Sequence, residues 1–350
     1  MIVTRTPFRI TLGGGGTDLP AFYEKHGGYV LALGIDKYMY VTMNVPYADR
    51  KVRLHYTQSE TVDSVRELKH ELAREAFRTH GIDDAVEVAS LADLPAGTGL
   101  GSSSAYLVGL LTAIRAYLGK PSTQHGLAQE AVHIELDVLA KPIGQQDQFM
   151  AALGGLTELI IDRSGSVTVK SIDLPGFAVN ELVANTHLYY TNIQRTTTDI
   201  LGEQTASLRS GGGNVESALT EIIDIGHAIG AAVRSGNFDE FGRLTHTHWE
   251  AKKRLSGKVS LPQLDALYSE ARARFGVLGG KVVGAGGGGF LMLYTPQNGG
   301  ALTEFMAAHG MARLTYAAEY EGSRVLVNTM NGRSIADAHH YSARSNGSPS

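Results

Sequence analysis

The chain has 350 residues, of which 43% are hydrophobic and 19% charged, and its formal net charge is −4 at pH 7. The absence of cysteine excludes a disulfide framework and a thiolate metal site, and the mild negative charge argues against a nucleic-acid partner. No apolar stretch approaches the roughly twenty residues of a membrane span, and no basic run indicates a membrane surface. The first residues carry no signal-peptide pattern, so we expect a cytoplasmic protein.

The first half of the chain is predicted to be rich in strands, with a few buried helices. The first strand, residues 2–12, ends at four consecutive glycines, 13–16. Alternating side chains predict further strands at 29–45 (two segments, the clearer at 36–45), 51–57, 85–91, 156–161 and 167–172. Apolar residues at helical spacing predict helices at 60–80, 103–118 and 122–140. We expect a boundary within 174–181.

The second half is predicted to be a helical layer over a smaller sheet, which makes the whole chain an α+β protein. Helical patterns occur at 198–209, 214–235, 238–254, 262–275 and 300–309. A glycine-rich segment at 279–289 is followed by strands at 290–294, 312–319 and 323–328. The last ten residues, 341–350, are polar and are expected to be disordered.

The most informative segment is PAGTGLGSSSA, residues 95–105, a glycine-rich loop that leads directly into a predicted helix. Glycines allow the backbone to approach an anion closely, and a helix start offers unpaired N–H groups and the positive end of a dipole. The hydroxyls of Ser102, Ser103 and Ser104 could donate to phosphate or bind a metal ion. A simple helix cap is the alternative, although a cap needs only one serine.

Two common nucleotide-binding signatures do not fit this sequence. The pattern G-x-x-x-x-G-K-[ST] is absent, which excludes a Walker-type loop. Gly97 and Gly99 begin a G-x-G-x-x-G pattern, but Ser102 stands where the third glycine belongs. Residues 284–289 satisfy that spacing, yet a predicted strand rather than a helix follows them. A dinucleotide-dependent oxidoreductase is therefore disfavoured.

The loop instead resembles the phosphate loop of the GHMP kinases, with the pattern P-x-x-x-G-L-G-S-S-S-A. The resemblance extends to residues 6–18, to Glu135 with residues 144–148, and to residues 281–289, so it covers nearly the whole chain. It implies an α+β GHMP kinase fold with the site in a cleft between the halves. The implied parts are an N-terminal ribosomal-protein-S5-like α/β domain over 1–180 and a C-terminal ferredoxin-like α+β domain over 181–340.

The resemblance also implies roles for charged residues. Asp147, expected in an irregular stretch, would be the catalytic base, and Arg9 would stabilise charge on the transferred phosphoryl group. Asp18 would accept hydrogen bonds from sugar hydroxyls, whereas Glu135 and Ser103 would hold Mg²⁺. The alternatives are a turn cap for Asp18, a structural ion pair for Arg9 and a solvated carboxylate for Asp147; the register of Glu135 could differ by one or two residues.

The remaining implied contacts belong to the glycine segments. In addition to the serines, residues of the phosphate loop would hold ATP, namely Pro95, Gly97, Gly99, Leu100 and Gly101. Sugar-binding positions would be Gly15, Gly16, Thr17 and Asp18 near the first turn and Gly286 and Gly287 near the last glycine loop. For the last loop, a supporting turn that touches no ligand is the alternative.

The residues within these motifs resemble those of one branch of the family. The first motif reads GGGTDLP and lacks the Glu-His pair usual in galactokinases and mevalonate kinases. It resembles D-glycero-D-manno-heptose 7-phosphate kinases and related fucokinase domains, as do residues 147–149 and 248–255. This implies phosphorylation of the anomeric hydroxyl to the 1,7-bisphosphate, a precursor of nucleotide-activated heptose for surface polysaccharide. A cationic pocket would bind the 7-phosphate, and Arg195, Lys252, Lys253 and Arg254 are candidates; a solvated helix end is the alternative.

The expected ligands are thus ATP, Mg²⁺ and a small-molecule sugar phosphate, with no nucleic-acid or membrane partner. A homodimer is left open. Two other functions remain alternatives: a GHMP kinase for another sugar such as L-fucose, and a sensor of sugar and ATP without catalysis. The sensor hypothesis predicts damage to the loop serines or the base, which the sequence does not show.

Overall fold

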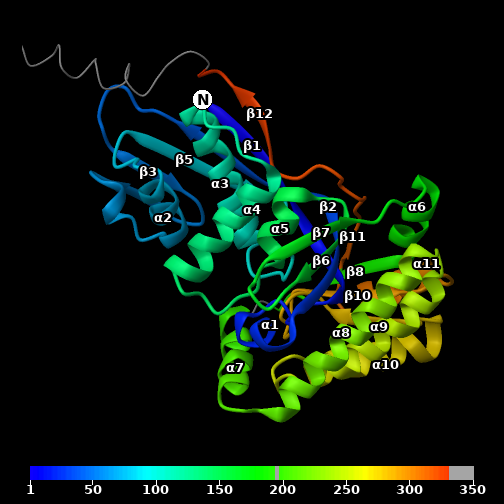
Figure 1. The fold of residues 1–350 in the computed structure, drawn as a ribbon. Coiled ribbons are helices and arrows are strands. Elements are labelled where there is room, and N and C mark those ends of the chain that lie inside the picture. The colour runs from blue at the N-terminus through cyan, green and yellow to red at the C-terminus, as the bar shows by residue number, and fades with distance from the viewer. Residues whose placement is uncertain (194–196, 331–350) are drawn as a thin grey trace, which may run out of the picture.

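The computed structural model describes residues 1–193 and 197–330. The strands form two sheets, one of eight strands and one of four (Figure 1). The order in the first sheet is β12-β1-β2-β5-β3-β4, with β6 pairing β2 and β7, and the order in the second is β11-β8-β10-β9. One hydrophobic core includes buried residues of both sheets.

The first sheet is built around two long antiparallel strands, β1 (Ile2–Gly14) and β2 (Gly28–Asn44). The two segments predicted at 29–45 are therefore one strand, whose pairing with β1 shifts between Pro7 and Phe8. The other strands are β3 (Val52–His55), β4 (Ser59–Val62), β5 (Val86–Ala92), β6 (Leu156–Ile161) and β7 (Val167–Ser171). Only the β3–β5 pair is parallel among the strand pairs described.

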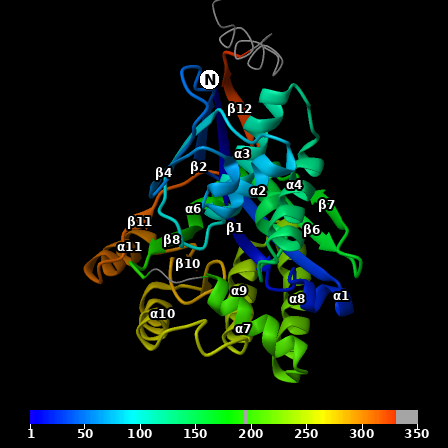
Figure 2. The ribbon, with the colours of Figure 1, turned by 90° about the vertical axis from the view of Figure 1, so that its left-hand side faces the viewer.

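Helices that carry the first half of the site pack against this sheet. Helix α3 (Ser102–Leu118) lies against β1 and β2 (Figure 2). It is buried along most of its length because its residues are apolar on most faces. Helix α5 (Gln146–Leu153) packs against α3 and β1. The other elements of this half are α1 (Pro20–His26), a 3₁₀ turn (Val65–Glu67), α2 (Glu71–Thr79), α4 (Gln124–Val132) and a π-helical turn (His133–Val138).

The second half places a helical layer beside both sheets. Helices α8 (Gly213–Arg234) and α9 (Phe238–Lys253) pack together; α8 contacts β1 and β2, whereas α9 contacts β1 and the second sheet. The remaining helices are α6 (Gly176–Asn185), α7 (Thr197–Arg209), α10 (Pro262–Phe275) and α11 (Gly299–Ala308). The strands are β8 (Thr186–Tyr190), β9 (Gly279–Val282), β10 (Phe290–Tyr294), β11 (Arg313–Leu314) and β12 (Arg324–Asn328).

The helix predicted over 60–80 is wrong in its first part. Residues 59–62 form β4, and only 71–79 form an α-helix. The carboxylate of Glu60 accepts hydrogen bonds from the N–H groups of Lys69 (2.6 Å) and His70 (3.1 Å), just before the helix begins. A strand residue thus binds backbone donors that a continuous helix would have used internally. The predicted strand at 312–319 shortens to β11, and α1, α6 and β8 were not predicted.

The C-terminal part of the described chain returns to the first sheet. Glu319 N donates to Gly34 O at 2.9 Å, and Gly155 N donates to Glu319 O at 2.7 Å. Strand β12 then pairs with β1. Residues 324–328 therefore complete the sheet of the first half, although the expected division at 180/181, which stays a prediction, assigns them to the second. The tail at 341–350 lies outside the described residues.

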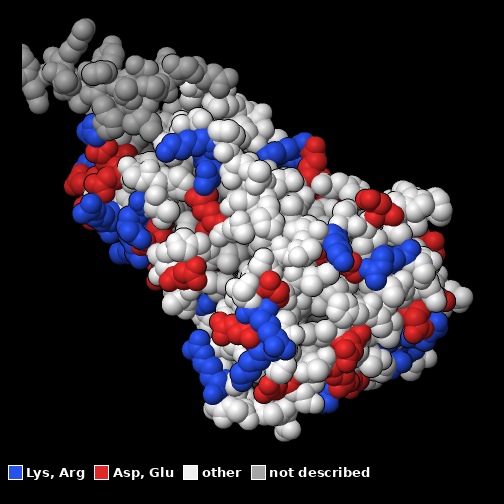
Figure 3. All heavy atoms as spheres, viewed as in Figure 1, with Lys and Arg blue, Asp and Glu red and all other residues white. Residues whose placement is uncertain are grey.

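The surface carries charges of both signs. Lysine and arginine side chains are interspersed with aspartate and glutamate over the face drawn in Figure 3, without one large patch of a single sign. Within residues 1–193 and 197–330, no helix combines the length and the apolar character that crossing a membrane would require.

Candidate active site

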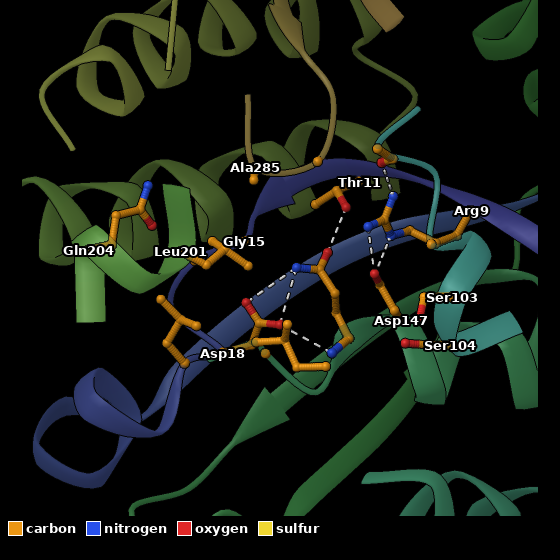
Figure 4. Close-up of a pocket in the computed structure, with 18 of the residues that line it drawn as sticks. Arg9, Thr11, Gly15, Asp18, Ser103, Ser104, Asp147, Leu201, Gln204 and Ala285 are labelled. Carbon is orange, nitrogen blue, oxygen red and sulfur yellow. Dashed lines mark hydrogen bonds and ion pairs between the residues drawn. The ribbon is translucent and has the colours of Figure 1, made fainter. Parts of the chain in front are cut away.

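A cleft lies where the end of β1, the start of α3 and the start of α5 meet residues of α7, α9 and the last glycine loop. Figure 4 shows Asp147 pointing toward Arg9, with Asp18 farther along the same cleft. The structure brings many of the predicted site residues to its walls: Arg9, Gly15, Gly16, Asp18, Gly97, Gly99, Gly101, Ser102, Ser103, Ser104, Glu135, Asp147 and Lys252.

Arg9 and Asp147 form an ion pair in the cleft. Arg9 Nε and Nη2 both contact Asp147 Oδ1, at 2.8 and 2.5 Å, and Arg9 Nη1 donates to Gly99 O at 2.7 Å. The Arg9 side chain is 5% exposed, whereas that of Asp147 is 28% exposed and therefore accessible to a ligand. Asp147 lies in the first turn of α5, so the expectation of an irregular stretch is wrong.

The phosphate loop ends in an uncapped helix. Gly101, the residue before α3, has a φ of 83°, a left-handed conformation that favours glycine. No side chain caps this helix start, so Ser102, Ser103 and Ser104 leave its first N–H groups available to a ligand. Two predicted loop residues do not line the cleft. Leu100 is buried, with its carbonyl accepting from Arg9 N at 3.2 Å, and Pro95 lies away from the cleft wall.

Glu135 is a buried carboxylate at the cleft floor, 1% exposed. Its Oε2 accepts hydrogen bonds from Ser104 Oγ at 2.7 Å and from Gln148 Nε2 at 2.6 Å. Burial raises the pKa of Glu135, and these hydrogen bonds oppose the rise. Ser104 is thus bonded to Glu135, whereas Ser103, the serine predicted to bind Mg²⁺ with Glu135, is more exposed at the cleft wall.

The oxygen ligands around Glu135 fit a Mg²⁺ ion that is bound together with a nucleotide. Among residues 1–193 and 197–330, no cluster of three or more His, Asp or Glu side chains could bind a metal by itself. One buried carboxylate beside serine hydroxyls fits an ion that takes most of its ligands from phosphate oxygens and water, as Mg²⁺ does in kinases. The site therefore fits a nucleotide-bound ion better than a permanently bound one.

Asp18 is held in a polar network that sequence analysis did not predict. Gln146 Nε2 donates to both oxygens of Asp18, at 3.1 and 3.2 Å, and Gln146 N donates to Oδ2 at 3.1 Å. Thr11 Oγ1 donates to Gln146 Oε1 at 2.6 Å, which fixes the orientation of the amide (Figure 4). Burial raises the pKa of Asp18, whereas the bonds from Gln146 favour its charged form. The only sequence signal for Gln146 is its position beside Asp147.

Several predicted contacts lie elsewhere. Thr17 is buried and braces Tyr29, donating to its carbonyl at 2.8 Å and accepting from its N–H at 3.1 Å. Lys253 pairs with Glu250 at 2.8 Å, away from the cleft. Arg254 pairs with Glu221.

Two predicted residues of the last glycine loop pack against Val259 instead of lining the cleft. Gly287 N donates to Val259 O at 2.7 Å. Gly286 also packs against Val259, so Gly284 and Ala285 are the residues of that loop that line the cleft. Arg195 lies outside the described residues.

The matches to known families agree with this fold and cleft. Residues 63–155 match the model of the GHMP kinases N terminal domain, and residues 228–310 match that of the GHMP kinases C terminal domain. Together with the sugar-kinase relatives below, they define a phosphotransferase. The chain belongs to the GHMP kinase family and is a sugar kinase with ATP as its phosphate donor, so the predicted fold class and enzyme class are confirmed.

The chain is also similar to individual proteins, at low sequence identity. The chain is 29% identical over 308 residues to a D-glycero-alpha-D-manno-heptose 7-phosphate kinase from Campylobacter jejuni, covering 84% of this chain and 89% of that protein. It is 28% identical over 325 residues to L-fucokinase/L-fucose-1-P guanylyltransferase from Bacteroides fragilis, covering 83% of this chain and 34% of that protein. A crystal structure of a D-glycero-D-manno-heptose 1-phosphate kinase from Bacteroides thetaiotaomicron shares the fold, with a TM-score of 0.77, 21% identity and coverage of 94% and 99%.

Proposed function

We propose that this kinase transfers the γ-phosphoryl group of ATP to the anomeric hydroxyl of D-glycero-D-manno-heptose 7-phosphate, giving the 1,7-bisphosphate. The observation that carries the proposal is the Arg9–Asp147 pair, which lies between the phosphate loop and the buried Asp18. The heptose substrate is supported by the relative from Campylobacter jejuni. The product belongs to the class that feeds nucleotide-activated heptose.

In the proposed reaction Asp147 is the base. As the anomeric oxygen forms its bond to the γ-phosphorus, its proton passes to the Asp147 carboxylate, and the bond from phosphorus to the β,γ-bridging oxygen breaks to release ADP. Both contacts from Arg9 go to Oδ1, whereas Oδ2 faces Gly101 of the phosphate loop. Arg9 thus orients the base and places positive charge where the phosphoryl group develops negative charge.

The other cleft residues would bind and align the two substrates. The uncapped start of α3 and its serines would hold the phosphates of ATP. Asp18, oriented by Gln146, would accept hydrogen bonds from sugar hydroxyls, with Gly15 and Gly16 beside it. Glu135 and Ser103 would hold Mg²⁺, which neutralises charge on the outer phosphates when bound.

The direct test is a product assay. The protein is incubated with ATP, Mg²⁺ and the heptose 7-phosphate, and products are followed by phosphorus NMR. The expected result is a new anomeric phosphate signal that grows in step with ADP. Absence of turnover removes the heptose assignment while leaving the family intact.

Replacement of the base tests the mechanism. Asp147→Asn keeps the shape of the side chain and an oxygen that can accept from Arg9, but it removes the proton acceptor. We expect kcat to fall by about 10²–10⁴-fold, with the affinity for ATP little changed. A rate close to that of the unaltered enzyme would exclude the assigned role.

L-Fucose is the second candidate substrate, because the chain also matches the fucokinase from Bacteroides fragilis. A panel of unphosphorylated sugars distinguishes the two candidates. Turnover of L-fucose with a higher kcat/KM than the heptose phosphate would favour this alternative, and binding without any turnover would favour a sensor.

A further inference from the structure

Two lysines of the cleft bond to backbone carbonyls instead of carboxylates. Lys281 is 2% exposed; it extends from β9 in the second sheet to β1 in the first, where Nζ donates to Leu12 O at 2.9 Å. Lys252, on α9, donates to Val282 O at 2.9 Å and to Gly284 O at 2.5 Å. Both lysines line the cleft, and the described residues give neither an ion pair with a carboxylate.

These lysines lie where the two glycine loops touch. A Cβ atom added to Gly284 would be 2.7 Å from Gly99 Cα, so the two backbones are in direct contact. Arg9 holds the carbonyl of Gly99, and Lys252 holds the carbonyl of Gly284. Two basic side chains therefore bind the two sides of one junction, and this junction is part of the wall next to the start of α3.

The charges around the lysines leave room for an anion. Burial and the charge of Arg9 lower the pKa of Lys252 to about 7, and burial together with Lys252 and Arg9 lowers that of Lys281 far below its usual value. His248, the other titratable group on α9 that faces them, is buried, and its Nε2 contacts Gly14 O at 2.8 Å, so it adds no negative charge. Asp147 is already paired with Arg9. A buried ammonium group without an anionic partner tends to lose its proton, and a ligand anion would restore the charged form of both lysines.

We infer that Lys252 and Lys281 form, beside Arg9, a subsite for a phosphate group at the junction of the two glycine loops. The inference rests on the proposed function only in taking ATP and a sugar phosphate as the ligands. The phosphate could come from the end of the nucleotide or from the sugar. Lys281 has donors left after its single carbonyl bond, and Lys252 has one left after its two.

The first experiment uses the unaltered protein. Binding of ADP, a non-hydrolysable ATP analogue, the heptose 7-phosphate and inorganic phosphate is measured by calorimetry at pH 8 in buffers of different ionisation enthalpy. Phosphate monoesters are already deprotonated at this pH, and a ligand that still carries part of a proton would release it on binding to a basic site, so net proton uptake reports on the protein, with the lysines as its basic groups in the subsite. Proton uptake with the ATP analogue but not with ADP means that the subsite binds the terminal phosphate of the nucleotide. Proton uptake with the heptose 7-phosphate means that it binds the phosphate of the sugar. If no ligand takes up protons on binding and none binds more weakly to the lysine variants described next, the inference is overturned.

The second experiment removes each charge. Lys252→Met and Lys281→Met keep most of the side-chain volume, and Lys170→Met on the exposed part of β7 is the matched control. We expect at least about tenfold weaker binding of the ligand identified above and loss of its proton uptake, with the control unchanged. Circular dichroism confirms folding. Unchanged binding in both cleft variants would overturn the inference and leave the lysines with a structural role in the loops. If only the turnover of the heptose phosphate fails, the proposed substrate is wrong, but the binding of nucleotide and inorganic phosphate still tests the subsite.

Discussion

At the scale of single residues, the cleft depends on close packing around Asp18. This carboxylate is 1% exposed and receives three hydrogen bonds from Gln146. Gly144 also packs against it, so closely that a Cβ atom there would lie 1.9 Å from Asp18 Oδ2. A residue with any side chain at this position must therefore displace the carboxylate that is proposed to bind the sugar.

Replacement of Gly144 tests this packing. The backbone of Gly144 does not need the left-handed region, so Gly144→Ala acts through its methyl group and not through strain. We expect kcat/KM for the sugar to fall by about 10²-fold, because small displacements of binding groups have effects of that size. The KM for ATP should change little. Gly176→Ala, which meets open space at the start of α6, is the control; equal kinetics in the two variants would contradict the packing argument.

Individual site residues were predictable only where a motif contained them. Arg9, Asp18 and Asp147 belong to segments whose pattern resembles a family, and the structure brings all three to one cleft. Gln146 and Lys281 also lie in such segments, but the resemblance assigned them no role, and their partners Asp18 and Leu12 lie more than a hundred residues away. Their roles depend on tertiary contacts that a local pattern does not contain.

At the scale of elements, periodicity predicted the long helices and failed where a distant group decides the boundary. Helices α3, α8 and α9 follow their apolar spacing and end within a few residues of the predicted limits. Residues 60–80 also have helical spacing, but Glu60 lies on β4 and binds the N–H groups that precede α2. The elements that were missed, such as α1 and β8, are short and give little periodic signal.

The hydrogen bonds of Glu60 should stabilise the segment that leads into α2. Its carboxylate accepts two backbone N–H bonds and one from Tyr56 OH at 3.1 Å, whereas the capping bond of α2 itself is donated by Ala73 N to His70 Nδ1 at 3.3 Å. Glu60→Ala should lower the free energy of unfolding by about 1–2 kcal/mol, because two backbone donors lose a charged acceptor. Denaturant unfolding measures this, with Glu67→Ala, an exposed residue of the neighbouring 3₁₀ turn, as control. Because Glu60 is not part of the cleft, kcat should be unchanged; equal stability of the two variants would exclude this stabilising role.

At the scale of the whole molecule, the buried lysines make stability depend on pH. Lys252 has a pKa of about 7 in the folded protein, against about 10.4 for an unfolded chain. Between these values the unfolded chain binds a proton that the folded protein does not, so the free energy of unfolding increases with pH. Lys281 contributes in the same direction.

Without ligand, thermal unfolding should therefore occur at higher temperature at pH 9 than at pH 7. Each lysine that releases its proton on folding contributes at most about 1.4 kcal/mol per pH unit. The contribution of the pair is the difference between the unaltered protein and a variant carrying both Lys252→Met and Lys281→Met. If the two proteins show the same pH dependence, the lysines do not titrate in this range.

The pairing of β12 with β1 has a consequence for how the chain is made. Strand β1 leaves the ribosome well before its neighbour, because residues 324–328 follow it by about three hundred residues. Until then one edge of β1 has unpaired backbone groups, which are prone to pair with other chains. The first sheet is therefore completed only after residue 328 has been made, and the time for which a nascent chain is open to aggregation is set by the synthesis of all the residues between β1 and β12.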